Sequence, residues 1–513
     1  MIVSNRLPVD HVSGEGGTAE WRTSPGGLVA ALEPVMRQRD GVWIGWPGLA
    51  DQEFEPFEAD GIDLIPVPLS AAEVEDYYEG FSNDTLWPLY HDVISPPSFH
   101  REWWEAYQRV NRRFADAALA VAAPNAIVWV HDYQLQLVPK MLRDARPDLI
   151  IGFFNHIPFP AYGIYSQLPW RRQIVDGLLG ADVVGFQRVA DGGNFARAVR
   201  RLRGYETRGN IISVPIDDAA AAIDGAAADA DEPTAEAPMR HRSVGRRGHA
   251  IRTVLARPFP ISIDAQEYQR LAADPSIRAR AAEIREELGN PRVVMLGVDR
   301  LDYTKGIRHR MKAFGELLHD GAVSAEDVVL VQVASPSRER VDAYAQLRDE
   351  VEVMVSRING DFSELGHPAI HYLHQGYPRE EMVALYLAAD IMLVTALRDG
   401  MNLVAKEYVA SRTDQDGVLI LSEFAGASDE LRQALLVNPH DIDGLKAAIV
   451  QAMEMPRRER MRRMRTLRKR VLTHDVQRWS ATFLDALTRE DHHDPANRLD
   501  IPKRTVAAAD YGE

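Results

Sequence analysis

Cysteine is absent from all 513 residues of the chain. Disulfides, thiolate metal sites and a cysteine nucleophile are therefore excluded, and a reducing compartment is favoured. No apolar run approaches the roughly 18 residues that a membrane span needs. The opening stretch MIVSNRLPVD does not have the pattern of a secretory signal peptide. We accordingly expect a cytoplasmic protein that has no membrane as a partner.

Positive charge is also in short supply. The chain has 59 Lys and Arg against 75 Asp and Glu, which gives a formal net charge of −16 at pH 7. This balance argues against nucleic acid as a partner, and anionic substrates would need a local basic cluster to overcome the overall repulsion. The arginine-rich segment 456–471 is more typical of a solvated helix with an apolar seam than of a nucleic-acid site.

Clusters of metal ligands are missing from the sequence as well. The segment DIDG (441–444) faintly resembles a calcium loop, but the remaining ligand spacing is absent. The sequence LKAAIVQAM follows directly, so we interpret these four residues as the start of a helix. No metal site is predicted.

Short apolar runs are present in number, separated by amphipathic helical segments. They are apolar throughout rather than alternating, which is typical of parallel strands that helices cover on both faces. The sequence therefore predicts an α/β protein. The clearest runs lie at 126–132, 150–156, 182–187, 293–300, 328–335, 391–397 and 417–424.

The runs fall into two groups, separated by residues 200–290. Within this separator, the small and acidic stretch 217–238 indicates a mobile insertion, and the prolines of 256–264 suit a linker. We predict an N-terminal Rossmann-like domain followed by a second one, then a C-terminal helix that packs back on the N-terminal domain, and a tail. The predicted bounds are 1–262, 263–455, 456–485 and 486–513.

Polar or charged residues follow five of these runs. In open parallel sheets, ligands bind beyond the carboxyl ends of the strands. One such case would be ordinary, but five together predict a cleft. The residues are His131, Asp132, His156, Arg300, Lys305, Arg338, Arg398 and Asp399.

Each local signal also has a plain structural alternative. Arg300 and Lys305 suit a diphosphate, because arginine offers a planar fork of donors and lysine a mobile charge, but they could be surface charges. The glycine pair of SPGGLVAAL (24–32) could bring amides to an anion or form a simple turn. His156 could bond only a neighbour, and the aromatic run 75–91 is more often a core than a sugar site.

As a set, the motifs resemble the trehalose-6-phosphate synthases, retaining glycosyltransferases of family 20 with the two-Rossmann GT-B fold. They occur in the family's order and cover roughly residues 1–430. The motifs are SNRLP (4–8), GWPG (45–48), YYEGFSNDTLWP (77–88), RVN (109–111), HDYQL (131–135), GFFNHIPFP (152–160), GFQ (185–187), RLDYTKG (300–306), SPSRERV (335–341), RINGDF (357–362), LRDGMNLVAKEY (397–408) and SEFAGA (422–427).

The resemblance implies that glucose passes from a nucleoside-diphosphate-glucose to glucose 6-phosphate, giving α,α-trehalose 6-phosphate. It places the acceptor in the N-terminal domain and the donor in the C-terminal domain, with no cofactor, no required metal, and assembly as a dimer or tetramer. The implied acceptor residues are Arg6, Trp46, Tyr78, Trp87, Asp132 and Arg338. The implied donor residues are Gly26, Gly27, Arg300, Lys305, Asp399, Gly400, Met401, Asn402, Leu403, Val404 and Glu407. The implied catalytic residues are His156, Arg300, Lys305 and Asp399.

Two alternatives stay open at this point. Another GT-B enzyme, such as a glycogen or sucrose-type synthase or a pyridoxal-phosphate-dependent phosphorylase, would share the fold but would not explain the acceptor residues. A sugar-nucleotide sensor without activity would not explain the intact set of Arg300, Lys305, Asp399 and Glu407. The sequence does not distinguish UDP-, ADP- and GDP-glucose, since Glu407 is expected at the ribose rather than the base.

Overall fold

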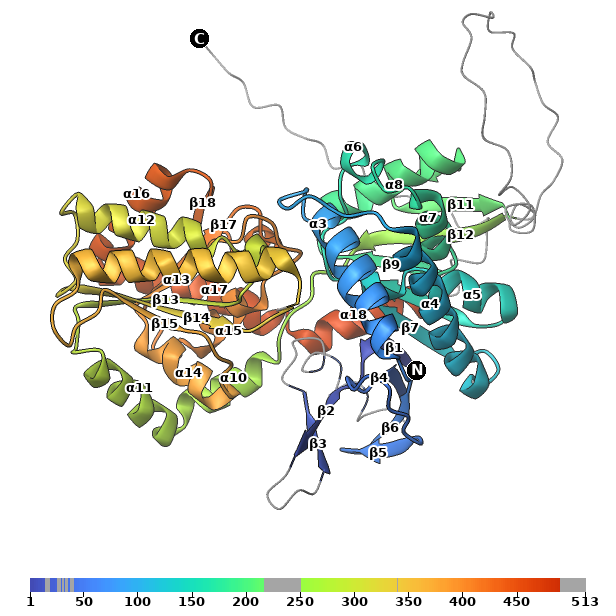
Figure 1. Ribbon diagram of the computed structural model, residues 1–513, viewed down its shortest axis with the longest axis horizontal. Helices are drawn as coiled ribbons and strands as arrows, with labels where there is room; N and C mark the ends of the chain where they lie inside the picture. Colours follow the sequence, from blue (N-terminus) through green and yellow to red (C-terminus); the bar gives the residue numbers. More distant parts are fainter. Residues whose placement is uncertain are drawn as a thin grey trace, which may run out of the picture.

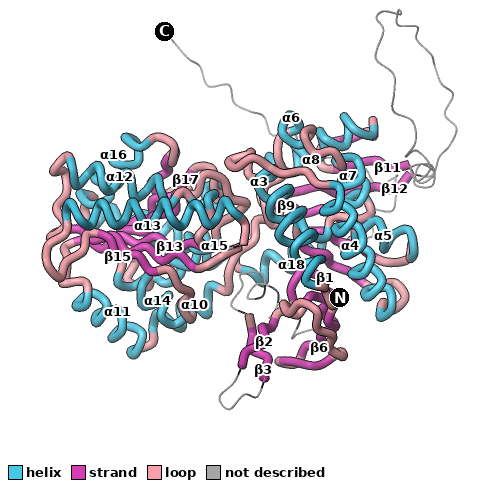
Figure 2. The backbone as a smooth tube through the Cα atoms, in the orientation of Figure 1, coloured by secondary structure: helices cyan, strands magenta, loops and turns pink. Residues whose placement is uncertain are grey.

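The computed structural model describes residues 1–13, 19–24, 29, 32, 36, 41–215, 251–338 and 340–489. Two sheets flanked by helices lie side by side in the molecule (Figure 1). In the tube view, helices surround the strands in both halves (Figure 2). The predicted α/β class is confirmed. The acidic stretch 217–238 lies outside the described residues.

The first sheet occupies the N-terminal half. Its strands are β1 (Ile2–Arg6), β4 (Val42–Trp46), β5 (Phe57–Ala59), β6 (Ile62–Pro66), β7 (Ile127–His131), β8 (Ile150–Phe154), β9 (Val183–Phe186), β10 (Thr207–Arg208), β11 (Ile211–Pro215) and β12 (Ile251–Pro258). Their order is β10-β11-β12-β9-β8-β7-β1-β4-β6-β5. The strands from β12 to β6 run parallel, and β5, β10 and β11 add antiparallel edges. A separate hairpin pairs β2 (Val9–Ser13) with β3 (Ala19–Thr23).

The second sheet is parallel throughout. Its strands are β13 (Val293–Arg300), β14 (Val328–Ser335), β15 (Ile370–Leu373), β16 (Ile391–Val394), β17 (Val418–Ser422) and β18 (Leu435–Val437). Their order is β15-β14-β13-β16-β17-β18. The chain therefore runs outward from β13 and then returns to its other side, as in a doubly wound Rossmann sheet.

Helices cover both faces of the sheets. In the N-terminal half they are α2 (Ala71–Glu73), α3 (Trp87–Tyr90), α4 (Arg101–Val121), α5 (Val138–Ala145), α6 (Tyr162–Tyr165), α7 (Arg171–Leu179) and α8 (Val189–Arg203), with the π-helix η1 (Val74–Leu86) and the 3₁₀ turn η2 (Tyr133–Leu135). In the remainder they are α10 (Ala265–Ala273), α11 (Pro275–Glu287), α12 (Ile307–His319), α13 (Asp342–Phe362), α14 (Arg379–Ala388), α15 (Leu403–Ser411), α16 (Ile442–Glu454), α17 (Arg457–Thr473) and α18 (Val476–Thr488), with the 3₁₀ turns η3 (Tyr303–Lys305) and η4 (Gly426–Asp429).

The two-sided cover explains why the strands read as continuous apolar runs. Along β13, Met295 belongs to the core beneath α12, α13 and α16, whereas its neighbours Val294 and Leu296 belong to the core beneath α10, α11 and α14. Because successive strand residues point to opposite faces, both sets have to be apolar. β7 shows the same pattern, with Val130 and Trp129 in different cores.

The segment 456–485, expected as one helix, forms two helices with different neighbours. α17 packs on α15 and β17 of the C-terminal half. α18 packs instead on β8 and β9 of the first sheet, where the Phe483 ring stacks on Trp129 with centroids 4.4 Å apart. The chain thus ends its described part on the half in which it began (Figure 1).

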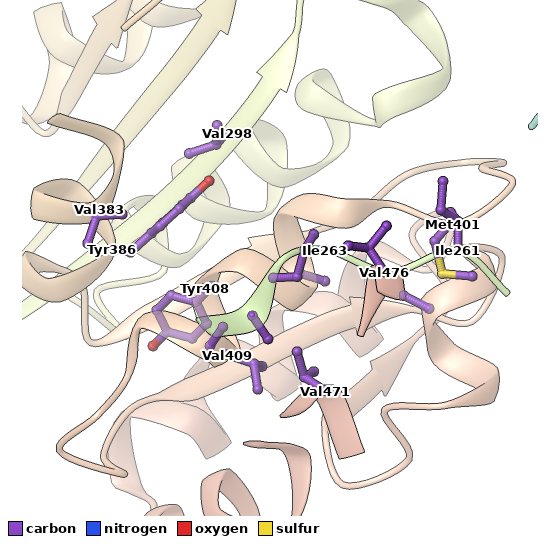
Figure 3. Packing of buried hydrophobic residues seen from close by; sticks show 14 of the residues in the cluster. Ile261, Ile263, Val298, Val383, Tyr386, Met401, Tyr408, Val409, Val471 and Val476 are labelled. Carbon is purple, nitrogen blue, oxygen red and sulfur yellow. The ribbon is translucent and has the colours of Figure 1, made fainter. Parts of the chain in front are cut away.

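The chain crosses between the halves twice, after β12 and again between α17 and α18. The two crossings are bonded together, since the Val476 amide donates to the Ile263 carbonyl over 3.0 Å. Figure 3 shows these two residues side by side in the buried apolar cluster. Lys406 of α15 donates to the carbonyl of Ile261 over 2.7 Å, which ties the first crossing to the C-terminal half.

No helix among the described residues is long and apolar enough to cross a membrane.

Candidate active site

The carboxyl ends of the two sheets face each other across the boundary between the halves. Gly400 follows β16, and a Cβ atom built on it would lie 2.2 Å from the carbonyl oxygen of His156, which follows β8. β13 and β16 flank the switch point of one sheet, and β1 and β7 flank that of the other. Ligands of doubly wound sheets bind at such switch points. The charged residues predicted at these strand ends therefore lie on facing edges.

Two arginines from the C-terminal half lie over a tryptophan of the N-terminal half. The guanidinium carbon of Arg338 is 3.8 Å from the centroid of the Trp87 ring, and that of Arg300 is 5.5 Å away. Arg338 also donates to the hydroxyl of Tyr133 over 3.1 Å. Its φ of 49° is left-handed, a conformation that is uncommon outside glycine and concentrates at functional sites.

Asp302, from the same half as the two arginines, lies next to Arg338. Its carboxylate is fully buried, lies 3.6 Å from the Arg338 guanidinium and accepts from the Tyr344 hydroxyl over 3.2 Å. Burial alone would raise the pKa of Asp302, but Arg338, Lys305 and Arg300 outweigh it and lower that pKa to about 2. An ionised carboxylate therefore lies beneath the basic cluster.

Lys305 and Asp399 form a second charged contact at the boundary. Nζ of Lys305 lies 2.6 Å from Oδ2 of Asp399, and the two side chains are only 10% and 14% exposed. Asn402 donates to the same oxygen over 3.3 Å. Burial would raise the pKa of Asp399, but the ammonium of Lys305 lowers it. The carboxylate thus orients the lysine where the two sheet edges meet.

Two histidines and an acid lie at the carboxyl ends of the adjacent strands β7 and β8, where His131 is the last residue of β7. Nδ1 of His131 and Nε2 of His156 are 3.1 Å apart, and the His156 amide donates to Oδ1 of Asp132 over 3.1 Å. Burial lowers the pKa of His156 to about 3. Burial also raises the pKa of Asp132 to about 6, against the backbone amides that it accepts from. The site therefore presents neutral imidazoles beside an acid that titrates near pH 6.

Arg6 lies among aromatic rings at the end of β1. Its guanidinium carbon is 5.1 Å from the centroid of the Trp46 ring, and its Nη2 is 2.6 Å from Oδ1 of Asp10. The Trp46 ring lies 6.1 Å from that of Tyr78, which belongs to the π-helix η1. Helices of this type are rare and frequently occur at functional sites. A basic group beside aromatic faces suits a phosphorylated sugar.

Glu407 lies on α15, beyond the loop that carries Asp399. Its Oε2 accepts from the Tyr386 hydroxyl over 2.8 Å, and the Tyr268 hydroxyl also bonds the carboxylate. Burial raises the pKa of Glu407. Asn402 caps α15 with a φ of 75°, and its side chain accepts from the Ala405 amide over 3.2 Å. The loop amides before the helix thus lie between the two acids.

Residues 1–489 match the profile of glycosyltransferase family 20. A trehalose-6-phosphate synthase of Mycolicibacterium gilvum is 55% identical over 498 residues, which are 96% of this chain and 94% of the relative.

The chain belongs to glycosyltransferase family 20.

Solved structures of the family agree with this assignment. An α,α-trehalose-phosphate synthase (UDP-forming) from Burkholderia vietnamiensis has a TM-score of 0.81 at 32% identity, covering 95% of this chain and 96% of that one. A UDP-forming relative from Burkholderia xenovorans in complex with glucose-6-phosphate has a TM-score of 0.80 at 32% identity, covering 95% and 99%. The predicted resemblance, the GT-B fold and the glycosyltransferase class are confirmed.

Some residues of the site were not predicted from the sequence, and two predicted ones cannot be placed. Gly26 and Gly27, predicted to approach the donor, lie outside the described residues. Asp302 and Tyr133 fall within quoted motifs but were not predicted as site residues, because an acid or a tyrosine there shows no role until its neighbours are known. Tyr268 and Tyr386 lie outside all quoted motifs, and no sequence signal connects them with Glu407.

Proposed function

We propose that this glycosyltransferase moves glucose from a nucleoside-diphosphate-glucose to glucose 6-phosphate, with retention of configuration, and forms α,α-trehalose 6-phosphate. The observation that carries the proposal is the gathering of Arg300, Lys305 and Arg338 at the boundary of a chain whose net charge is −16. Both proposed substrates carry phosphate groups, for which arginine and lysine are favoured partners.

On the acceptor side, Arg6 and Arg338 hold the phosphate of glucose 6-phosphate in this proposal. Tyr78, Trp46 and Trp87 supply the aromatic walls for the sugar, and Asp132 accepts from a sugar hydroxyl. The support is that the two arginines contact Trp46 and Trp87 respectively, so that cation and ring are already paired.

On the donor side, Arg300 and Lys305 neutralise the diphosphate, and Glu407 accepts from both ribose hydroxyls. Asp399 and the amides of residues 400–404 hold the transferred glucose, and His156 faces its 6-hydroxyl. The support is the course of the chain, since residues 400–402 and the first turn of α15 separate the two acids. Glu407 lies four residues into α15, about 6 Å along the helix from its first residue.

The chemistry follows from charge that develops on the leaving group. The acceptor hydroxyl attacks the anomeric carbon on the face that the diphosphate leaves, and the electron pair of the broken bond passes to the diphosphate. A phosphate oxygen takes the proton of the hydroxyl. Arg300 and Lys305 then stabilise the departing diphosphate more than the bound donor, which is the condition for catalysis.

Incubation of the protein with UDP-glucose and glucose 6-phosphate tests the proposal. We expect trehalose 6-phosphate and UDP, with no product when glucose or glycogen replaces the acceptor. Product from glycogen but not from glucose 6-phosphate would show that the chain is a different GT-B enzyme. Donor binding without turnover of any acceptor would support a sensor instead.

The nucleobase is addressed by a second measurement. Structural neighbours that are UDP-forming favour UDP-glucose as the donor. Competition among UDP-, ADP- and GDP-glucose for trehalose 6-phosphate formation gives the preference directly. A preference for ADP- or GDP-glucose would correct the base while leaving the acceptor and the reaction unchanged.

A further inference from the structure

His131 contributes a buried ring to the wall behind His156. It is 0% exposed, and its Nδ1 is 3.1 Å from Nε2 of His156. Trp129 lies 4.8 Å from the His131 ring, and Phe154 and Trp479 lie 4.6 and 6.4 Å from the His156 ring, measured between centroids. Trp479 comes from α18, so the last described helix closes this apolar wall.

The hydrogen-bond partners of the two rings determine which nitrogen carries the proton between His131 and His156. Burial lowers the pKa of both histidines, so both rings are neutral, and each then carries one N–H and one lone pair. Nothing in the described part of the chain bonds Nε2 of His131. A proton there would be a buried N–H without an acceptor, which is rare in proteins.

We propose that His131 is a positioning residue whose Nδ1–H donates to Nε2 of His156, so that His156 carries its own proton on Nδ1 and donates it to a hydroxyl of the transferred sugar. This inference rests on the proposed function, in which His156 faces the 6-hydroxyl of the donor glucose. The backbone amide of His156 is bonded independently to Asp132. Loss of the His131 ring therefore removes the ring contact without releasing His156.

Two variants of His131 separate positioning from packing. His131→Asn keeps an N–H near the position of Nδ1, whereas His131→Leu removes it at similar bulk. With UDP-glucose and glucose 6-phosphate, His131→Leu should lower kcat about five- to tenfold at nearly constant KM, the effect of about one hydrogen bond. His131→Asn should restore most of the rate.

A donor without the hydroxyl group supplies the control. With UDP-6-deoxyglucose, His131→Leu and the unsubstituted enzyme should have the same kcat, because the bond that His156 donates is missing in both. Equal losses with both donors would overturn the proposal, since a purely structural role would affect them alike.

The proton can also be observed directly by ¹⁵N NMR of protein with labelled histidine. The His156 signals, assigned by their absence from His156→Ala, should show protonation at Nδ1. Protonation at Nε2 overturns the proposal, whether or not His131→Leu folds. An unsubstituted protein that forms no trehalose 6-phosphate would overturn the proposed function instead, and the NMR measurement would still decide the ring contact.

Discussion

Replacing Gly400 by alanine should hold the two halves of the enzyme apart. The added Cβ would lie 2.2 Å from the carbonyl oxygen of His156 and 3.2 Å from the Cα of Ile157. Both are backbone atoms of a buried segment in the other half, so no side-chain rotation can relieve the contact. Real Cβ atoms essentially never lie closer than 3.0 Å to such an atom, so the halves must separate by about 1 Å.

The separation of the two halves would displace groups of the candidate active site, so it should lower the rate. Gly400 lies between Asp399, which is paired with Lys305, and the carbonyl of His156, so the displacement occurs among the proposed reacting groups. A misplacement of 1 Å can lower a rate about 100-fold. We expect kcat/KM of Gly400→Ala to fall by about that factor, with little change in thermal unfolding, because the cores of both halves are untouched.

Steady-state kinetics, thermal unfolding and small-angle scattering with bound donor check this expectation. The control is Gly193→Ala on the exposed face of α8, where an added Cβ meets nothing within 4 Å. That variant should keep its kinetics. Activity of Gly400→Ala within twofold of the unsubstituted enzyme would refute the reasoning, as would a loss of activity that unfolding fully explains.

Three further predictions concern the donor side. Lys305→Ala should lower kcat about 100- to 1000-fold with a smaller change in donor KM, because the lysine stabilises the developing charge; a raised KM at constant kcat would contradict this role. Glu407→Gln should weaken donor binding about tenfold in calorimetry, since one acceptor for the ribose becomes an amide; unchanged affinity would remove Glu407 from the ribose site. EDTA should leave turnover unchanged, because the chain's own cations neutralise the diphosphate; a loss that magnesium restores would show otherwise.

The parallel strands could be predicted because their burial on both faces requires continuous apolar runs in the sequence. Residues 293–300 were expected as a strand and form β13 with the same bounds. A strand covered on both faces needs apolar residues at every position, so it can be recognised from its own sequence without knowledge of its neighbours. The start of α16 could also be predicted from a local signal. Asp441 caps the helix by accepting from the Gly444 amide over 2.9 Å.

Other features depend on contacts that no local pattern records. The edge strand β10 contains only two residues, which are recognised as a strand through their pairing with β11. The π-helix η1 packs against α4, and this packing accompanies its wider turn. Asp302 is one acid among many in the sequence, and its low pKa depends on Arg338, which the fold brings to it, as well as on its sequence neighbours Lys305 and Arg300.

The arrangement of these acids also shows how a chain of net negative charge keeps a basic cluster in place. Lys305 is paired with Asp399, Arg338 with Asp302 and Arg6 with Asp10. A buried cation without a counter-charge is strongly destabilising, so Asp399 and Asp302 keep the buried Lys305 and Arg338 in place before any ligand arrives. The Arg6 side chain is 41% exposed and gains less from its pairing with Asp10. An anionic ligand then has to compete with these carboxylates for the same donors. Phosphate groups have more acceptor oxygens than a carboxylate, which favours them in this competition.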